Sequence, residues 1–93
     1  MTITILGREI PVEFVSQKTL DEVSEDKESI GYFDGNSIFI KQSLPAAQKQ
    51  RVLKHEIIHA MFNISGLTHL LKPDIEEAIC DLMENTPDAQ LSL

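Results

Sequence analysis

Two histidines and a glutamate in residues 55–59 have the types and spacing of a metal-binding group. The sequence there is His55-Glu56-Ile57-Ile58-His59, an H-E-x-x-H pattern. On an α-helix, His55 and His59 lie about one turn apart on the same face, so both imidazoles can reach one Zn²⁺. Glu56 beside them is placed to handle the proton of a metal-bound water. The stretch therefore predicts a metal site, with Zn²⁺ as the expected ion, although two His and a carboxylate also suit Fe²⁺.

A helix over about 46–64 is expected to carry this motif. Pro45 is followed by two alanines, and Ser43, two positions upstream, is a candidate N-cap. No Gly or Pro follows until Gly66. Apolar residues cover more than half of the circumference of this helix: Leu53, Ile57, Ile58, Ala60, Met61 and Phe62. Such a helix is buried, and its inward polar groups need partners, which a metal ion would supply.

The residues before this helix predict two β-hairpins. Apolar and polar residues alternate in 2–6 and 10–15 around Gly7-Arg8, and Pro11 places its strand at an edge or a bulge. Residues 31–33 and 37–41 flank the turn Asp34-Gly35-Asn36, a strong hairpin signal. The acidic segment 16–29 is expected to be a solvated loop with at most one helical turn.

A second helix is expected after Gly66, which should end the first helix in the left-handed conformation. It should begin at Lys72-Pro73-Asp74 and run to about Asn85, before Thr86-Pro87. Its core stripe is predicted to be Ile75, Ala78, Ile79 and Leu82. The fold class is therefore α+β, a small antiparallel sheet of β-hairpins followed by two helices, in one domain spanning 1–93.

A catalytic zinc needs a third protein ligand, and several residues after the motif are candidates. The H-E-x-x-H-x-x-G-x-x-H continuation is absent, which excludes a metzincin. The candidates are His69, Asp74, Glu76, Glu77 and Asp81. The spacing alone does not separate Glu76 from Glu77, and Asp74 with Glu77 also fits a capping box. His69 is interpreted as a surface histidine and Cys80 as a small buried apolar residue.

Glu77 and Asp81 form an E-x-x-x-D pattern that begins 18 residues after His59. In this the sequence resembles the gluzincin metallopeptidases. That resemblance implies that Glu77 is the third zinc ligand and that Asp81 orients one of the ligating histidines. The stretch from Gly31 to Asp81 is similar to the small ImmA/IrrE-type or SprT-like zincin domains of bacteria and phages. This resemblance implies a minimal zincin-like architecture.

The same resemblance implies a zinc-dependent peptidase with Glu56 as its catalytic base and a protein or peptide as its substrate. Such an enzyme would act on a regulatory protein, and residues 38–41 would lie above the site and pair with an extended substrate. Tyr32 is expected to pack in the hairpin, or else to donate to a substrate oxyanion. The alternative is a non-catalytic zinc-binding or protein-interaction module on a zincin scaffold, with His69 as a candidate fourth ligand.

Composition narrows the remaining classes of function. The 93 residues carry a net charge of −7, which argues against binding a phosphate backbone. The chain lacks a run of about 20 apolar residues, so no membrane span is expected. Cys80 is the sole cysteine and cannot form an internal disulfide. With no signal peptide at the amino terminus, the expected location is intracellular.

Overall fold

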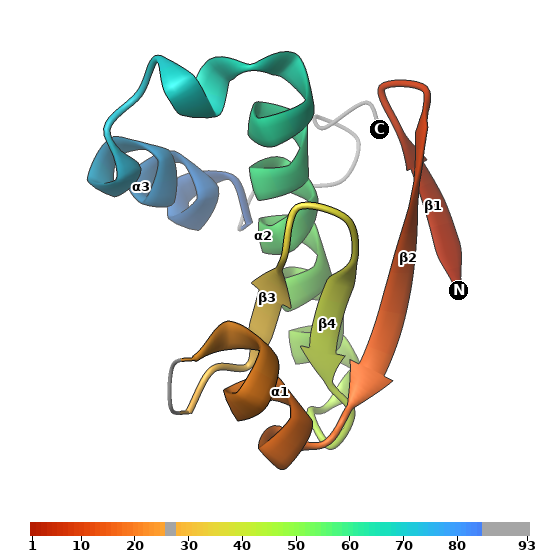
Figure 1. The fold of residues 1–93 in the computed structure, drawn as a ribbon. Helices are drawn as coiled ribbons and strands as arrows, with labels where there is room; N and C mark the ends of the chain where they lie inside the picture. The colour runs from red at the N-terminus through yellow and green to blue at the C-terminus, as the bar shows by residue number, and fades with distance from the viewer. Residues whose placement is uncertain (26–27, 85–93) are drawn as a thin grey trace.

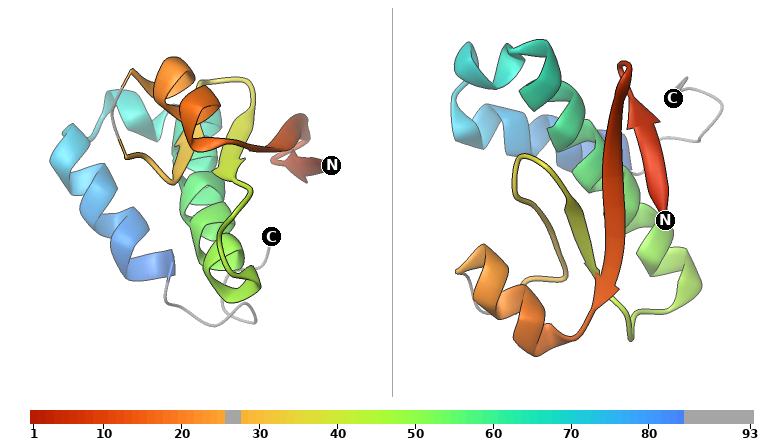
Figure 2. Two further views of the ribbon diagram at one scale, coloured as in Figure 1. Left: turned by 90° about the horizontal axis from the view of Figure 1, so that it is seen from below. Right: turned by 45° about the vertical axis from the view of Figure 1, so that its right-hand side comes forward.

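The computed structural model describes residues 1–25 and 28–84, in which helix α2 packs against both the sheet and helix α3 (Figure 1). Within these residues the elements are β1 (Thr2–Ile5), β2 (Arg8–Val15), α1 (Gln17–Ser24), β3 (Gly31–Phe33), β4 (Ile38–Lys41), α2 (Ala46–Ser65), the 3₁₀ turn η1 (Leu67–His69) and α3 (Pro73–Glu84). Seen from below, α3 runs along one side of α2 and the sheet lies on another (Figure 2). The predicted α+β class is confirmed.

The sheet joins two antiparallel hairpins through one parallel pair of strands. Its order is β1-β2-β4-β3, with β1–β2 and β3–β4 antiparallel. Strands β2 and β4 are parallel, and Val12 lies opposite Ile38. The sheet was predicted to be antiparallel throughout, and this prediction is wrong for the β2–β4 pair. The cause is the connection through α1 and β3, which brings the chain back so that β4 runs in the same direction as β2.

Pro11 lies where β2 has only one neighbouring strand. Residues 8–11 of β2 pair with β1, whereas residues 12–15 pair with β4. Strand β2 is therefore an inner strand of the sheet, but its half that contains Pro11 has no partner on the β4 side. A residue without an N–H is tolerated at such a position because no second ladder needs that donor.

Helix α1 replaces the solvated loop expected for residues 16–29, and that prediction is wrong over Gln17–Ser24. The Ser16 hydroxyl oxygen accepts a hydrogen bond from the Thr19 backbone N–H, which caps the helix. Leu20 is 0% exposed and anchors the helix in the molecule. The prediction gave weight to the many acidic residues of this segment and overlooked Leu20 as a core residue and Ser16 as an N-cap.

Helix α2 supplies one face of the main core and confirms the predicted motif helix. Buried apolar residues from three strands and α2 meet there: Ile5, Ile10, Val12, Ile38, Ile40, Val52, Ile57 and Ala60. The helix begins after Pro45 without a side-chain cap, so Ser43 does not have the predicted capping role. Gly66 ends it with φ of 85°, as expected. Among the described helices, none is long and apolar enough to cross a membrane.

Helix α3 lies with a different face inward from the predicted one. Of the expected core stripe, Ile75 is 45% and Leu82 73% exposed, whereas Cys80 is fully buried. Cys80 packs with Ile58 of α2 in a small second cluster. Glu76, Glu77 and Glu84 of α3 contact the histidines of α2, and with this face toward α2 much of the apolar stripe is turned outward. The predicted end of this helix at Asn85, before Thr86-Pro87, lies outside the described residues.

Removal of the Leu20 side chain tests the packing of α1. Leu20→Ala is expected to lower the free energy of unfolding by about 2–5 kcal/mol, because a fully buried leucine leaves a cavity. The exposed neighbour Glu22→Ala should change it by no more than about 0.5 kcal/mol. Urea denaturation followed by circular dichroism measures both. Equal, small effects would show that residues 17–24 do not pack as described.

Candidate metal centre

A cavity of about 750 Å³ lies between strand β3 with its turn and the facing sides of helices α2 and α3. Its walls contain every residue of the predicted metal site, together with further acidic residues of α3. The lining groups that can carry charge are Asp34, His55, Glu56, His59, Glu76, Glu77, Asp81 and Glu84. The fold thus brings the H-E-x-x-H motif of α2 and the acidic face of α3 to one place.

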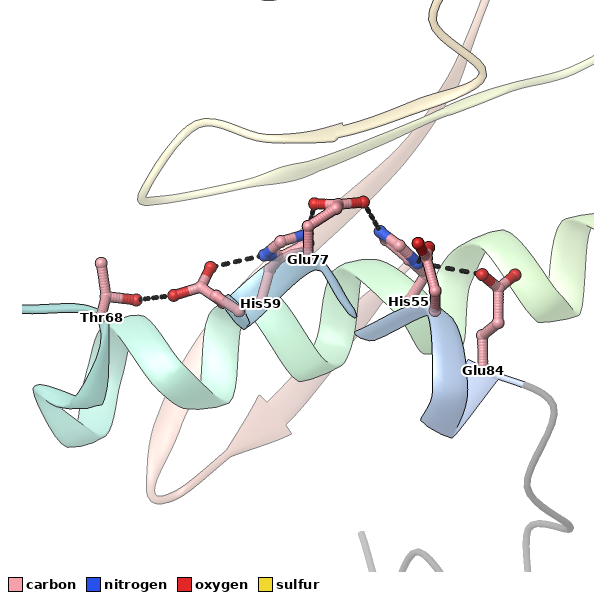
Figure 3. A network of polar contacts seen from close by, with 7 residues as sticks. His55, His59, Thr68, Glu77 and Glu84 are labelled. Atoms are coloured by element: carbon pink, nitrogen blue, oxygen red, sulfur yellow. Dashed lines mark hydrogen bonds and ion pairs between the residues drawn. The ribbon is translucent and has the colours of Figure 1, made fainter. Parts of the chain in front are cut away.

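The Glu77 carboxylate lies between the two histidine rings (Figure 3). Its Oε1 is 2.8 Å from Nε2 of His55, and its Oε2 is 2.9 Å from Nε2 of His59. The two rings lie edge to face, with their centroids 4.9 Å apart. Two histidines one turn apart on α2 and one glutamate of α3 therefore lie together, and all three are of the types that bind zinc.

The other ring nitrogens also face carboxylates. Nδ1 of His59 is 2.6 Å from Oε2 of Glu76, and Nδ1 of His55 is 3.2 Å from Oε1 of Glu84. Asp81, the predicted orienting residue, is farther from Nδ1 of His55, at 3.5 Å, and its side chain is 61% exposed. Glu76 and Glu84 therefore occupy the outer positions from which carboxylates orient metal-binding histidines.

The carboxylates around His55 and His59 limit the possible protonation states of the two rings. A neutral imidazole has one N–H donor, whereas both nitrogens of His55 and of His59 face carboxylate oxygens. Either the rings are protonated or a cation lies among the Nε2 atoms and Glu77. Burial lowers the pKa of His55, but the charges of Glu56 and Glu77 and the contact with Glu84 outweigh burial and raise that pKa above its ordinary value.

Glu56 lies next to the histidines but is buried under strand β3. It is 8% exposed, and its carboxylate packs beneath Gly31. A Cβ atom at Gly31 would lie 2.4 Å from Val52 Cγ1 and 3.2 Å from Glu56 Oε2. Burial raises the pKa of the Glu56 carboxyl, and the imidazoles of His55 and His59 only partly oppose this. The group is therefore more ready to hold a proton than a carboxyl in water.

Two groups of side chains in the described part of the chain could hold a metal ion by the proximity of their ligand atoms. One is His55, His59 and Cys80, and the other is His55, Glu77 and Asp81. Both contain residues of the predicted site, but the first would use a thiol. Burial raises the pKa of the Cys80 thiol to about 12, and the carboxylates of Glu77 and Glu76 contribute to this. The thiol therefore keeps its proton in the metal-free protein. Glu77 offers one carboxylate oxygen to each Nε2 atom.

Other predicted residues have no direct part in this arrangement. His69 is exposed on η1, as predicted, and Asp74 is exposed near the start of α3. Tyr32 is half-buried on the wall of the cavity. Strand β4 pairs with β2 on one side and β3 on the other, so the prediction that 38–41 pairs with a substrate is wrong.

Two contacting residues were not among the sequence candidates. Glu84 lies seven residues after Glu77, or about two turns along α3, so helical periodicity places the two on related faces. Thr68 donates its hydroxyl hydrogen to Glu76 at 2.6 Å. It lies in the segment that connects the helices, where no pattern in the sequence marks it.

Comparison with known proteins places the chain in a family. The DA1-like family model, described as Protein DA1, matches residues 2–86. Protein DA1-related 1 of Arabidopsis thaliana is 30% identical over 66 residues, which cover 71% of this chain. The matched part is only 12% of the length of that relative. No solved structure matches the chain.

These matches overturn the resemblance drawn from residues 31–81, because they point to DA1-like proteins and not to the ImmA/IrrE-type or SprT-like domains of bacteria and phages. The function inferred from that resemblance, a zinc peptidase acting on a regulatory protein, is wrong for the same reason. The assignments as a hydrolase and metalloprotease fall for the same reason. With its match over nearly the whole length, the chain belongs to the DA1-like family.

Proposed function

We propose that this DA1-like domain binds one divalent metal ion, with zinc preferred, through His55, His59 and Glu77. The observation that carries the proposal is the position of the Glu77 carboxylate, 2.8 Å from one Nε2 atom and 2.9 Å from the other. Two imidazoles and one carboxylate are a donor set typical of zinc. With unprotonated Nε2 atoms these contacts would bring acceptor atoms together, and a cation among them would relieve the repulsion.

The charges around the two histidines support a cation at this place. Five carboxyl groups line the cavity beside the two rings: Glu56, Glu76, Glu77, Asp81 and Glu84. Carboxylates gathered in one cavity repel one another unless positive charge is placed among them. The contacts of Glu76 and Glu84 with the outer nitrogens would direct both Nε2 atoms toward the ion.

We propose further that the domain is an enzyme. A bound zinc ion would supply Lewis-acid chemistry, lowering the pKa of water toward about 7. Glu56 is the residue placed to accept a proton, since it is buried beside His55 and His59 without being held between their Nε2 atoms. Its raised pKa suits a group that takes up a proton and later returns it.

Metal content tests the assignment of the histidines. Purified protein dialysed against zinc should hold one ion per chain by mass spectrometry, and zinc should raise the melting temperature, because binding to the folded state alone stabilises it. His55→Ala and His59→Ala should each abolish both effects. His69→Ala, an exposed histidine on η1, is the matched control and should retain them. Zinc retained by both motif variants would refute the site.

Glu77→Gln and Cys80→Ala separate the two possible donor sets. Glu77→Gln should weaken zinc binding by about 100-fold or more, exceeding the 10–100-fold typical of an outer contact. Cys80→Ala should leave the affinity within about threefold, although it removes a buried side chain and lowers stability. Isothermal titration calorimetry measures both affinities. A thiolate-to-cobalt charge-transfer band in the wild-type protein loaded with Co²⁺ would instead identify Cys80 as a ligand.

Glu56→Gln tests the role of the buried carboxyl. Because Glu56 is not one of the three proposed ligands, the variant should bind zinc with an affinity within about threefold of wild type. The visible spectrum of the protein loaded with Co²⁺ should change with pH as the metal-bound water ionises, and Glu56→Gln should shift the midpoint of that change, because the variant removes the neighbouring carboxyl that can accept the proton. An unchanged midpoint would remove Glu56 from the chemistry, whereas lost zinc binding would make it a ligand.

A further inference from the structure

Glu76 and Glu77 are consecutive residues of α3, yet they contact opposite nitrogens of the same imidazole. Oε2 of Glu76 is 2.6 Å from Nδ1 of His59, and Oε2 of Glu77 is 2.9 Å from Nε2. The two side chains differ in exposure as well. Glu76 is 14% exposed, whereas Glu77 is 52% exposed. The two acids therefore have different environments and different tasks.

Thr68 holds the second oxygen of Glu76. Its hydroxyl donates to Oε1 of Glu76 at 2.6 Å, while Oε2 faces His59. One carboxylate thus links the 3₁₀ turn η1, helix α3 and helix α2 by two short contacts (Figure 3). Both oxygens of Glu76 are engaged, which restricts the rotation of its side chain. An acceptor held in this way fixes the orientation of the group that donates to it.

We propose that Glu76, held by Thr68, is a positioning residue that fixes the His59 ring with Nδ1–H toward α3 and Nε2 toward Glu77. An ionised carboxylate is an acceptor only, and carboxylates face both nitrogens of this ring. Glu76 is the closer and the more buried of the two acceptors, so it favours the tautomer that carries its proton on Nδ1. The lone pair of Nε2 is then directed into the site. Carboxylates that hold histidines in this manner typically change metal affinity by 10–100-fold. Thr68 contributes without touching either the histidine or the proposed ion.

His55 has a weaker counterpart of this arrangement, which explains why we assign the role to Glu76. Nδ1 of His55 faces Glu84 at 3.2 Å and Asp81 at 3.5 Å. The side chain of Glu84 is 25% exposed, and that of Asp81 61%. The acceptor of His59 is the closer and the more buried of these carboxylates. The orientation of His59 is consequently the more strongly determined of the two rings.

The tautomer of His59 in metal-free protein tests the proposal directly. Nitrogen NMR of the imidazole rings should show the Nδ1–H form in wild type at a pH where the ring is neutral. Glu76→Ala should shift His59 to a mixture rich in the Nε2–H form, with little change at His55. Asp74→Asn removes one negative charge from an exposed position of the same helix and should leave His59 as in wild type. This NMR arm of the test does not depend on the proposed function, because it is carried out without a metal ion.

Zinc affinity gives a second readout, which rests on the proposed function. Thr68→Val, which keeps the shape but removes the hydroxyl, should weaken zinc binding by about 10-fold, the lower end of the range for outer contacts. Thr68→Ser should restore it to within about twofold. If wild type binds no zinc, the proposed function fails while the NMR arm still decides the role of Glu76. An unchanged tautomer in Glu76→Ala, or in Thr68→Val if the first variant does not fold, would overturn the proposal.

Discussion

The contact that the rest of the molecule depends on is the pairing of acidic α3 with the histidine face of α2. Two imidazoles cannot be buried cheaply without partners, and several carboxylates cannot be brought together without positive charge. Where the two helices meet, the carboxylates of α3 give the imidazoles polar partners, and protonated imidazoles or a cation between them would reduce the repulsion among the carboxylates. The contacts of Glu76, Glu77 and Glu84 with the two rings are the result. They determine which face of α3 is turned inward.

The same pairing explains why the apolar side chains of α3 are divided. Cys80 is buried against Ile58, but Ile75 and Leu82 remain largely exposed. A hydrophobic stripe alone would have rotated α3 the other way, since burying a leucine contributes about 1.5–3 kcal/mol. In the structure the inward face instead carries Cys80 and the carboxylates that contact His55 and His59. The helix is therefore positioned by the candidate metal centre as much as by the core.

Strand β3 forms the wall of the cavity that faces helices α2 and α3. It can lie this close to α2 because residue 31 is a glycine. The strand approaches α2 so closely that any side chain at residue 31 would meet Val52 and Glu56. The close approach covers Glu56 and lowers its contact with water, which is the physical cause of its raised pKa. A carboxyl group beside two imidazoles thus differs from the exposed acids of α3, although all belong to one cavity.

The sequence by itself determined the motif and most of the local elements, but not helix α1. Alternation predicted the hairpins, the span without Gly or Pro predicted α2, and the spacing of His55 and His59 placed both on one face of that helix. The spacing alone named Glu76 and Glu77 as candidates without separating them, and Glu77 was selected only through a resemblance. The sequence pattern could not choose the family, because an H-E-x-x-H pattern is three fixed positions that unrelated chains share. Only the tertiary structure decided the parallel β2–β4 pair, the rotation of α3 and the places of Thr68 and Glu84. These depend on how two helices and a sheet meet in space, and contacts between distant segments leave no periodic trace in a single chain.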